Sequence, residues 1–165
     1  MPLEPAVTDL DKLKEQPVVS KLVAWNAASV QRAKLDRGEI TVWVPRELIR
    51  DAVNFLKSDP ELDFNYLADV TCVDWIPAEP RFEVVYHMLS LARKARIRLK
   101  VGLNSDEPNI ESVVPVFPSA NFFEREIFDL FGIRFSGHPN LRRILMPEDW
   151  EGHPLRKDYP VEGYR

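Results

Sequence analysis

The amino-acid sequence predicts an α+β protein: a two-layer domain with helices on one face of a mixed or antiparallel sheet, followed by an extended C-terminal arm. Runs with helical spacing of apolar residues alternate with runs rich in β-branched and aromatic residues. The length of 165 residues corresponds to one domain, and both patterns stop after Phe135. We therefore expect a globular domain over residues 1–135 and a proline-rich, partner-binding arm over residues 136–165.

The first part of the chain predicts two helices that flank a hairpin. Each helix opens with a proline, which the first helical turn tolerates, and continues with apolar residues on one face. The strands between them are rich in β-branched residues and are joined across the turn Asp36-Arg37-Gly38. The predicted elements are a helix near 17–27, strands over 29–35 and 40–44, and a helix that begins at Pro45 and ends at Ser58-Asp59-Pro60.

Three strand-like runs follow, over residues 70–76, 82–89 and 96–103, and their short links predict an antiparallel meander. In the third run, apolar residues alternate with basic residues. One face of that strand is therefore expected to be buried, and the other to be solvated or to meet an acidic partner. The prolines of residues 106–119 predict a loop.

A third helix is predicted to begin at Asn121, whose side chain would cap the first turn, with Glu124 reaching back to complete a capping box. Gly132 stands where a helix commonly ends with a residue of positive φ. Arg125 and Asp129 are one helical turn apart, which predicts an ordinary surface ion pair. The carboxylates of this helix therefore give little reason to expect acid–base catalysis.

Composition excludes several classes of function. The net charge of -4 and the absence of a Lys/Arg cluster disfavour binding of nucleic acid. Cys72 is the only cysteine, which excludes an internal disulfide and a multi-thiolate metal site and suits a reducing compartment. We expect Cys72 to be a small core residue, with a reactive thiol as the alternative. The chain shows no nucleotide-binding loop.

Membrane and secretion signals are not expected either. No apolar run approaches the roughly 20 residues of a membrane-spanning helix. The first residues show neither a basic region nor an apolar stretch of the kind found in secretory signals. Any association with a membrane is therefore expected to come through partner proteins.

Residues 136–165 are too apolar for a solvated tail, yet their prolines prevent a long helix, so they need a surface to lie on. Residues 137–143 and 152–157 form a near repeat, with Gly, His and Pro followed by a leucine and two basic residues. Two similar turns or a recognition arm would both explain it. A metal site at His138 and His153 is disfavoured, because no cysteine or nearby carboxylate set completes it.

The run from Glu124 to Pro139, continued through residues 141–160, resembles the 30 kDa subunit family of respiratory complex I. Residues 64–71 and 80–87 are also similar to that family, whereas the first 35 residues match less clearly. The resemblance implies a non-catalytic subunit of the peripheral arm, on the cytoplasmic side of a bacterial inner membrane. It would scaffold the large quinone-site subunit and the terminal iron–sulfur subunits during proton-translocating electron transfer.

The complex of that family uses NADH, FMN, iron–sulfur clusters and quinone, but the resemblance implies that this subunit binds no cofactor or metal and has no catalytic residue. We expect apolar anchors and basic side chains of the arm to meet partner subunits. The domain is expected to fold without the arm. The predicted partner-binding residues are Glu124, Arg125, Glu126, Asp129, His138, Arg142, Arg143, Trp150, His153, Arg156, Lys157, Asp158 and Tyr159.

Two alternatives remain open at this point. The first is the equivalent subunit of a related membrane-bound hydrogenase or F420H2 dehydrogenase. The second is an independent small enzyme with a proton relay built from His138, His153 and Asp158. That relay lacks an evident nucleophile or substrate pocket in the sequence.

Overall fold

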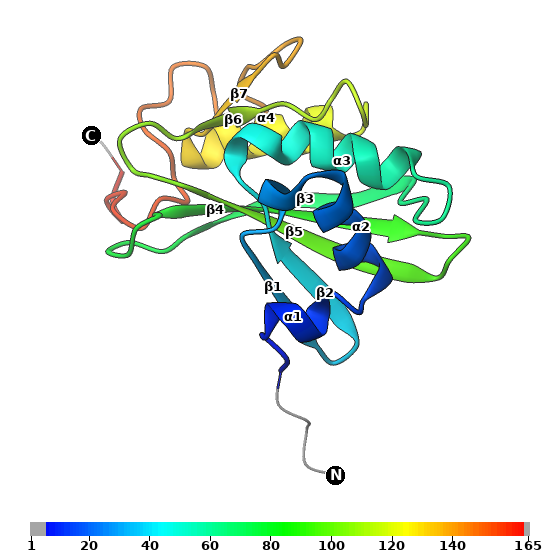
Figure 1. Ribbon diagram of the computed structural model, residues 1–165. Helices are drawn as coiled ribbons and strands as arrows, with labels where there is room; N and C mark the ends of the chain where they lie inside the picture. The colour runs from blue at the N-terminus through cyan, green and yellow to red at the C-terminus, as the bar shows by residue number, and fades with distance from the viewer. Residues whose placement is uncertain (1–5, 164–165) are drawn as a thin grey trace.

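Alternating apolar residues build a five-stranded sheet in the computed structural model, which describes residues 6–163. The spatial order is β1-β2-β5-β4-β3, in which β2 and β5 run parallel and all other neighbours are antiparallel (Figure 1). The predicted hairpin and meander are therefore confirmed, and of the two expected kinds of sheet, mixed or antiparallel, the sheet is the mixed one. The strands are β1 (Arg32–Asp36), β2 (Glu39–Trp43), β3 (Tyr66–Asp74), β4 (Phe82–Ser90) and β5 (Ala95–Leu103).

The two faces of the sheet differ as the alternation predicts. In β5, Ile97, Leu99 and Val101 are buried in the core. On the opposite face, Arg98 pairs with Glu39 on β2 (Nη2–Oε2, 3.0 Å), and Lys100 pairs with Glu83 on β4 (Nζ–Oε1, 2.6 Å). The basic residues of β5 are thus neutralised in part by carboxylates of the neighbouring strands.

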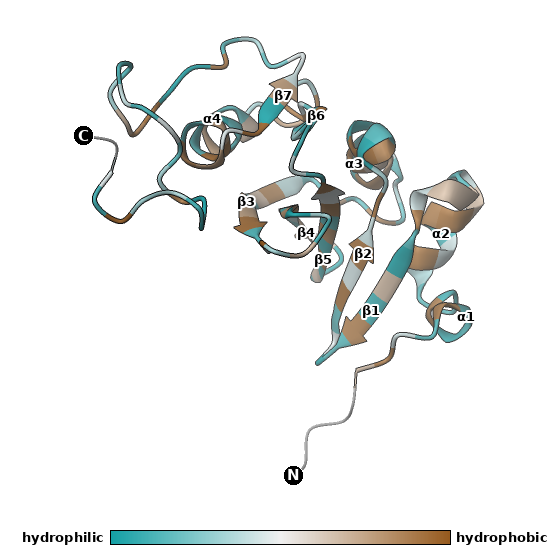
Figure 2. Ribbon diagram, turned by 90° about the vertical axis from the view of Figure 1, so that its left-hand side faces the viewer, coloured by the Kyte–Doolittle hydropathy of each residue, from teal (hydrophilic) through white to brown (hydrophobic). Residues whose placement is uncertain are grey.

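Helices cover one side of this twisted sheet (Figure 2). The second and third helices confirm the helices predicted near 17–27 and after Pro45. A short 3-10 turn at Arg46–Leu48 precedes the third helix. Trp25 and Phe55 stack with ring centroids 5.0 Å apart and join those two helices. The helices are α1 (Leu10–Leu13), which was not predicted, α2 (Pro17–Trp25), α3 (Ile49–Ser58) and α4 (Ala120–Phe131).

A second, two-stranded sheet corrects the prediction that residues 106–119 form only a loop. Strands β6 (Asn109–Glu111) and β7 (Arg134–Ser136) pair in parallel. Ile110 lies opposite Phe135, and both side chains are buried, so this pair closes the core beside α4. Strands of three residues are too short to produce a recognisable alternation in the sequence.

Cys72 lies in β3 with its side chain in the core, as predicted for a structural cysteine. Burial, reinforced by the negative charge of Asp74, raises the pKa of the Cys72 thiol to about 12. A thiol with this pKa is almost entirely protonated at neutral pH and is a poor nucleophile. The alternative of a reactive thiol is therefore disfavoured.

Candidate partner-binding site

Residues 137–163 contain no helix or strand in the described chain. We call them the C-terminal segment. Figures 1 and 2 show this segment running past α4 toward the loop that joins β3 to β4. The sequence predicted that it needs a surface to lie on, and the domain itself supplies one. Gly137 and Gly152 have φ of 79° and 78°, so the near repeat does form two similar turns.

The buried carboxylate of Asp129 is the first anchor of the C-terminal segment. Its Oδ2 accepts hydrogen bonds from the backbone amides of Ile144, Leu145 and Met146 at 2.8–3.0 Å. Its Oδ1 accepts from Nη1 of Arg143 at 2.6 Å. Burial acts to raise the pKa of Asp129, but the four hydrogen bonds outweigh burial and lower it. The carboxylate is therefore held ionised inside a cradle of donors from one stretch of chain.

The predicted surface pair between Arg125 and Asp129 is wrong. Asp129 is fully buried and pairs with Arg143 instead. Arg125 donates from Nε to the carbonyl of Arg142 (3.2 Å) and from Nη2 to the carbonyl of Arg143 (3.0 Å). Both side chains thus bind the C-terminal segment rather than each other.

The C-terminal segment also caps the end of α4, whose last carbonyls lack partners within the helix. The carbonyl of Asp129 accepts from Nδ1 of His153 at 2.9 Å, and the carbonyl of Leu130 accepts from the amide of Leu155 at 3.0 Å. The carbonyl of Phe131 accepts from Nε of Arg156 at 2.6 Å. These cationic and N–H donors oppose the negative end of the helix dipole.

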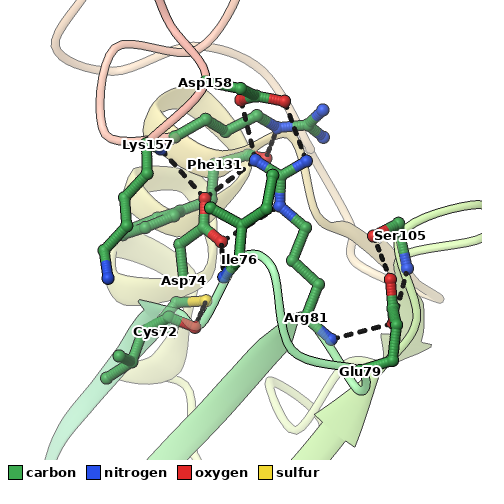
Figure 3. A network of polar contacts seen from close by, with 11 residues as sticks. Cys72, Asp74, Ile76, Glu79, Arg81, Ser105, Phe131, Lys157 and Asp158 are labelled. Atoms are coloured by element: carbon green, nitrogen blue, oxygen red, sulfur yellow. Dashed lines mark hydrogen bonds and ion pairs between the residues drawn. The ribbon is translucent and has the colours of Figure 1, made fainter.

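A second anchor joins the C-terminal segment to the β3–β4 loop (Figure 3). Arg81 makes a bidentate pair with Asp74 (Nε–Oδ1, 3.0 Å; Nη2–Oδ2, 2.8 Å) and a second pair with Asp158 (2.7 and 2.9 Å). The amide of Lys157 also donates to Asp74 (2.9 Å). Arg81 is the largest influence that lowers the pKa of Asp74, so this buried carboxylate stays charged.

The predicted capping box at the start of α4 is also wrong. The helix begins at Ala120 without a side-chain cap, and Glu124 is fully buried. Glu124 accepts from Oγ of Ser112 (2.6 Å) and from the amide of Val113 (2.7 Å). Burial raises its pKa to about 7, although both hydrogen bonds act in the opposite direction. Glu124 therefore ties α4 to the chain that follows β6.

The remaining predicted partner-binding residues either make contacts apart from the two anchors or are exposed. His138 donates from Nε2 to the carbonyl of Asn121 (3.3 Å) and accepts at Nδ1 from the amide of Asn140 (3.0 Å). The Tyr159 hydroxyl bonds to the carbonyl of Glu151 (3.3 Å). Exposed side chains are those of Glu126, Arg142, Trp150 and Lys157. Sequence reasoning missed Asp74 and Arg81 as members of the second anchor, and Ser112 as the partner of Glu124.

The outer surface of the C-terminal segment is apolar at several places. Leu145, Leu155 and Trp150 expose 60%, 51% and 39% of their surface. Trp150 contributes its carbonyl, not its ring, to the contact with Arg143. Several polar atoms of the segment therefore bind the domain while these three large apolar side chains are exposed, which is typical of a surface that meets another protein.

No cluster of metal-binding side chains occurs among residues 6–163. Over the same residues, the helices are too short or too polar to span a bilayer. The chain is thus an α+β domain whose C-terminal segment is held by buried carboxylates and carries exposed apolar side chains. The family model for the 30 kDa subunit of respiratory-chain NADH dehydrogenase matches residues 42–165. The chain belongs to that family.

Relatives of similar length agree with this assignment. One is the NADH-quinone oxidoreductase subunit designated C of Roseiflexus sp., which is 55% identical over 125 residues, or 76% of this chain and 72% of that protein. The same subunit of Geobacter sulfurreducens is 49% identical over 146 residues, or 88% of this chain and 89% of that protein.

Two solved structures share the fold. One is a trypsin-resistant fragment (1-134) of Nqo5, with a TM-score of 0.58 and 36% identity over 63% of this chain and 83% of the fragment. The other is a chain from the membrane-bound sulfane sulfur reductase, an archaeal respiratory membrane complex. That match has a TM-score of 0.75 and 26% identity over 90% of this chain and 86% of the other.

Gly132 offers a test of the contact between α4 and the C-terminal segment. Its φ is +74°, and a Cβ atom there would lie 2.5 Å from the His153 ring. Gly132→Ala should release the segment around His153 and Arg156, with faster hydrogen exchange at the amide of Leu155. Gly137→Ala is the matched control, because its φ is +79° with no atom within 4 Å of the added Cβ.

Both substitutions should cost about 1 kcal/mol from backbone strain. Only Gly132→Ala should add the loss of segment contacts, seen as a larger drop in the free energy of unfolding. Equal losses of stability and equal exchange rates in the two variants would show that the segment is not held there.

Glu124 predicts a pH dependence of stability. Its folded pKa of about 7 lies above the ordinary value of 4.5. Its contribution to stability is therefore fully present below about pH 4.5 and is lost as the pH rises through about 7. Glu124→Gln should remove this loss, so the variant gains roughly 2 to 3 kcal/mol relative to the parent between pH 4.5 and pH 8.

Denaturant unfolding across that pH range measures the effect. Glu126→Gln, an exposed change on the same helix, is the control and should leave the pH profile unchanged. Parallel profiles for the parent and Glu124→Gln would contradict the prediction.

Proposed function

We propose that this chain is a non-catalytic subunit of the peripheral arm of a bacterial, proton-translocating NADH-quinone oxidoreductase. The observation that carries the proposal is the family match, which includes the whole docked C-terminal segment. Relatives matched over most of their length bear the name of a subunit of that enzyme. In this role the chain scaffolds its neighbours while electrons pass from NADH to quinone.

The contacts of the titratable residues support a structural rather than catalytic role. His153 is bound to the carbonyl of Asp129, and His138 to the chain around Asn121. Asp158 pairs with Arg81, not with a histidine. The side chains of the alternative proton relay are therefore each engaged separately, which disfavours an independent small enzyme.

Partners, cofactors and location follow from the proposed role. The large quinone-site subunit and the terminal iron–sulfur subunits would meet the outer face of the C-terminal segment, on the cytoplasmic side of the inner membrane. The iron–sulfur clusters would be bound by other subunits, since the only cysteine here is a buried residue of β3. FMN, NADH and quinone are likewise proposed to be bound by other subunits. Nucleic acid is not an expected partner, given the net charge of -4.

A second candidate is the equivalent subunit of a related membrane-bound oxidoreductase, such as a hydrogenase or an F420H2 dehydrogenase. The fold match to a chain of the sulfane sulfur reductase complex favours it. Identity of 26% to that chain, against 49–55% to the NADH-quinone oxidoreductase relatives, favours the first candidate. A co-purified large subunit with a nickel site would instead establish a hydrogenase.

Exposed leucines of the C-terminal segment provide the test of assembly. A tagged chain purified from native membranes should bring with it NADH:quinone reductase activity and the other subunits. Leu145→Ser with Leu155→Ser should reduce incorporation about tenfold or more, since both changes remove apolar area that would be buried against a partner. The unfolding midpoint of the isolated chain should not change, because both side chains are exposed.

Leu91→Ser is the control, because Leu91 is equally apolar and exposed but lies in the β4–β5 turn. Native gels and peptide identification of the bands report incorporation. Normal assembly of the double variant would contradict the proposed surface, and absence of other NADH-quinone oxidoreductase proteins from the parent preparation would contradict the proposed function.

We also propose that the domain folds without the C-terminal segment. The trypsin-resistant Nqo5 fragment, which shares this fold, supports the idea. A chain that stops before Gly137 should still unfold cooperatively, at lower denaturant, because Asp129 loses its donors. It should fail to enter the complex. Loss of cooperative unfolding would show that the segment belongs to the folding unit.

A further inference from the structure

A cleft of about 800 Å³ opens between the β3–β4 loop, the chain that follows β5, and the end of β2. We call it the loop cleft. Residues of 43–47, 75–80 and 102–107 supply most of its walls, and the C-terminal segment supplies none. Its volume lies within the range of sites that enclose a ligand or several side chains. The anchors described above do not use it.

Specific contacts hold the walls of the loop cleft in place. Glu79 of the β3–β4 loop accepts from the amide (3.3 Å) and from the hydroxyl of Ser105, which joins the two loops (Figure 3). Gly102 lets the same loop lie against β5, because a Cβ atom at that position would be 2.6 Å from Cγ of Pro80. The cleft is therefore a built feature and not a gap between free loops.

Carboxylates outnumber cations around the loop cleft. Two arginines, Arg32 and Arg46, line it. Of the acidic residues, Glu83 is paired with Lys100 and Glu47 with Arg46. The others form no direct ion pair with a described lysine or arginine, although the negative charges of Asp106 and Glu107 contribute to raising the pKa of Arg46. The acidic lining residues are Glu47, Glu79, Glu83, Asp106 and Glu107.

Two tryptophans contribute to the apolar lining of the loop cleft. The guanidinium of Arg32 lies 3.7 Å from the centre of the Trp43 ring, and Nε1 of Trp43 donates to Glu83 (3.0 Å). Trp75 lines the same cleft with 49% of its surface exposed, and no described cation lies over it. The cleft thus already contains one arginine stacked on an indole, that of Trp43. The exposed indole of Trp75 could stack with a second arginine.

We propose that the loop cleft receives an arginine-rich, basic segment of a neighbouring subunit. A guanidinium stacks on Trp75 while Asp106 and Glu107 neutralise the charge. The chain's own arginines in the loop cleft are already engaged, since Arg46 pairs with Glu47 and Arg32 stacks on Trp43. This interface rests on the proposed function, because it requires that the chain is part of an assembly.

A photo-cross-linking residue at the exposed Ala78, inside the loop cleft, identifies the occupant in the purified complex. The expected product is a peptide of another subunit with at least two Arg or Lys residues beside the cross-linked position. The same residue at exposed Glu148 is the control and should not capture that peptide. Cross-linking to a second copy of this chain, to a neutral or acidic peptide, or to nothing would overturn the proposal.

Binding of a tetra-arginine peptide to the isolated full chain tests the charge directly. Asp106→Asn with Glu107→Gln should weaken binding about tenfold, and raising salt from about 20 mM to about 200 mM should weaken binding to the parent chain. The matched control Glu148→Gln with Asp149→Asn removes the same charge from exposed sites of the C-terminal segment and should change the Kd less than about twofold.

Equal weakening in both double variants, or no binding to the parent, would overturn the proposed role of the loop cleft. Either of these two results would leave the proposed function intact if the parent chain still assembles with the other NADH-quinone oxidoreductase proteins. Failure of the parent to assemble would reject the proposed function instead. The two failures are therefore distinguishable.

Discussion

The carboxylate of Asp129 connects the helical layer of the domain to the whole C-terminal segment. It collects a guanidinium and three consecutive amides from residues 143–146. A buried carboxylate without such donors would cost several kcal/mol, and the donors would be left without an acceptor if the carboxylate were removed. Domain and segment therefore depend on one another at this point.

Further contacts extend this dependence along the segment. The last carbonyls of α4 are capped by His153, Leu155 and Arg156, and Asp158 is held by Arg81. Because these contacts fix the polar atoms inward, Leu145 and neighbouring apolar side chains are presented outward. An ordered segment loses less conformational entropy when a partner binds it than a free tail would.

Local patterns in the sequence determined most of the fold. The alternation in residues 82–90 and 95–103 identifies strands because successive side chains in a strand point to opposite faces. Gly132 marks the end of α4 because its φ of +74° favours glycine. The sequence also showed that residues 137–163 need a surface, since their apolar content conflicts with their prolines.

Only the tertiary structure decided which carboxylates are buried and what they bind. The sequence predicted Glu124 and Asp129 to be exposed helix residues, because spacing within a helix identifies only partners three or four positions away. Their true partners, Ser112 and Arg143, come from other segments of the chain. Arg81 likewise reaches Asp158, whose position relative to β4 no local pattern specifies. Such contacts depend on how separate segments pack, so periodicity predicts the elements but not the anchors between them.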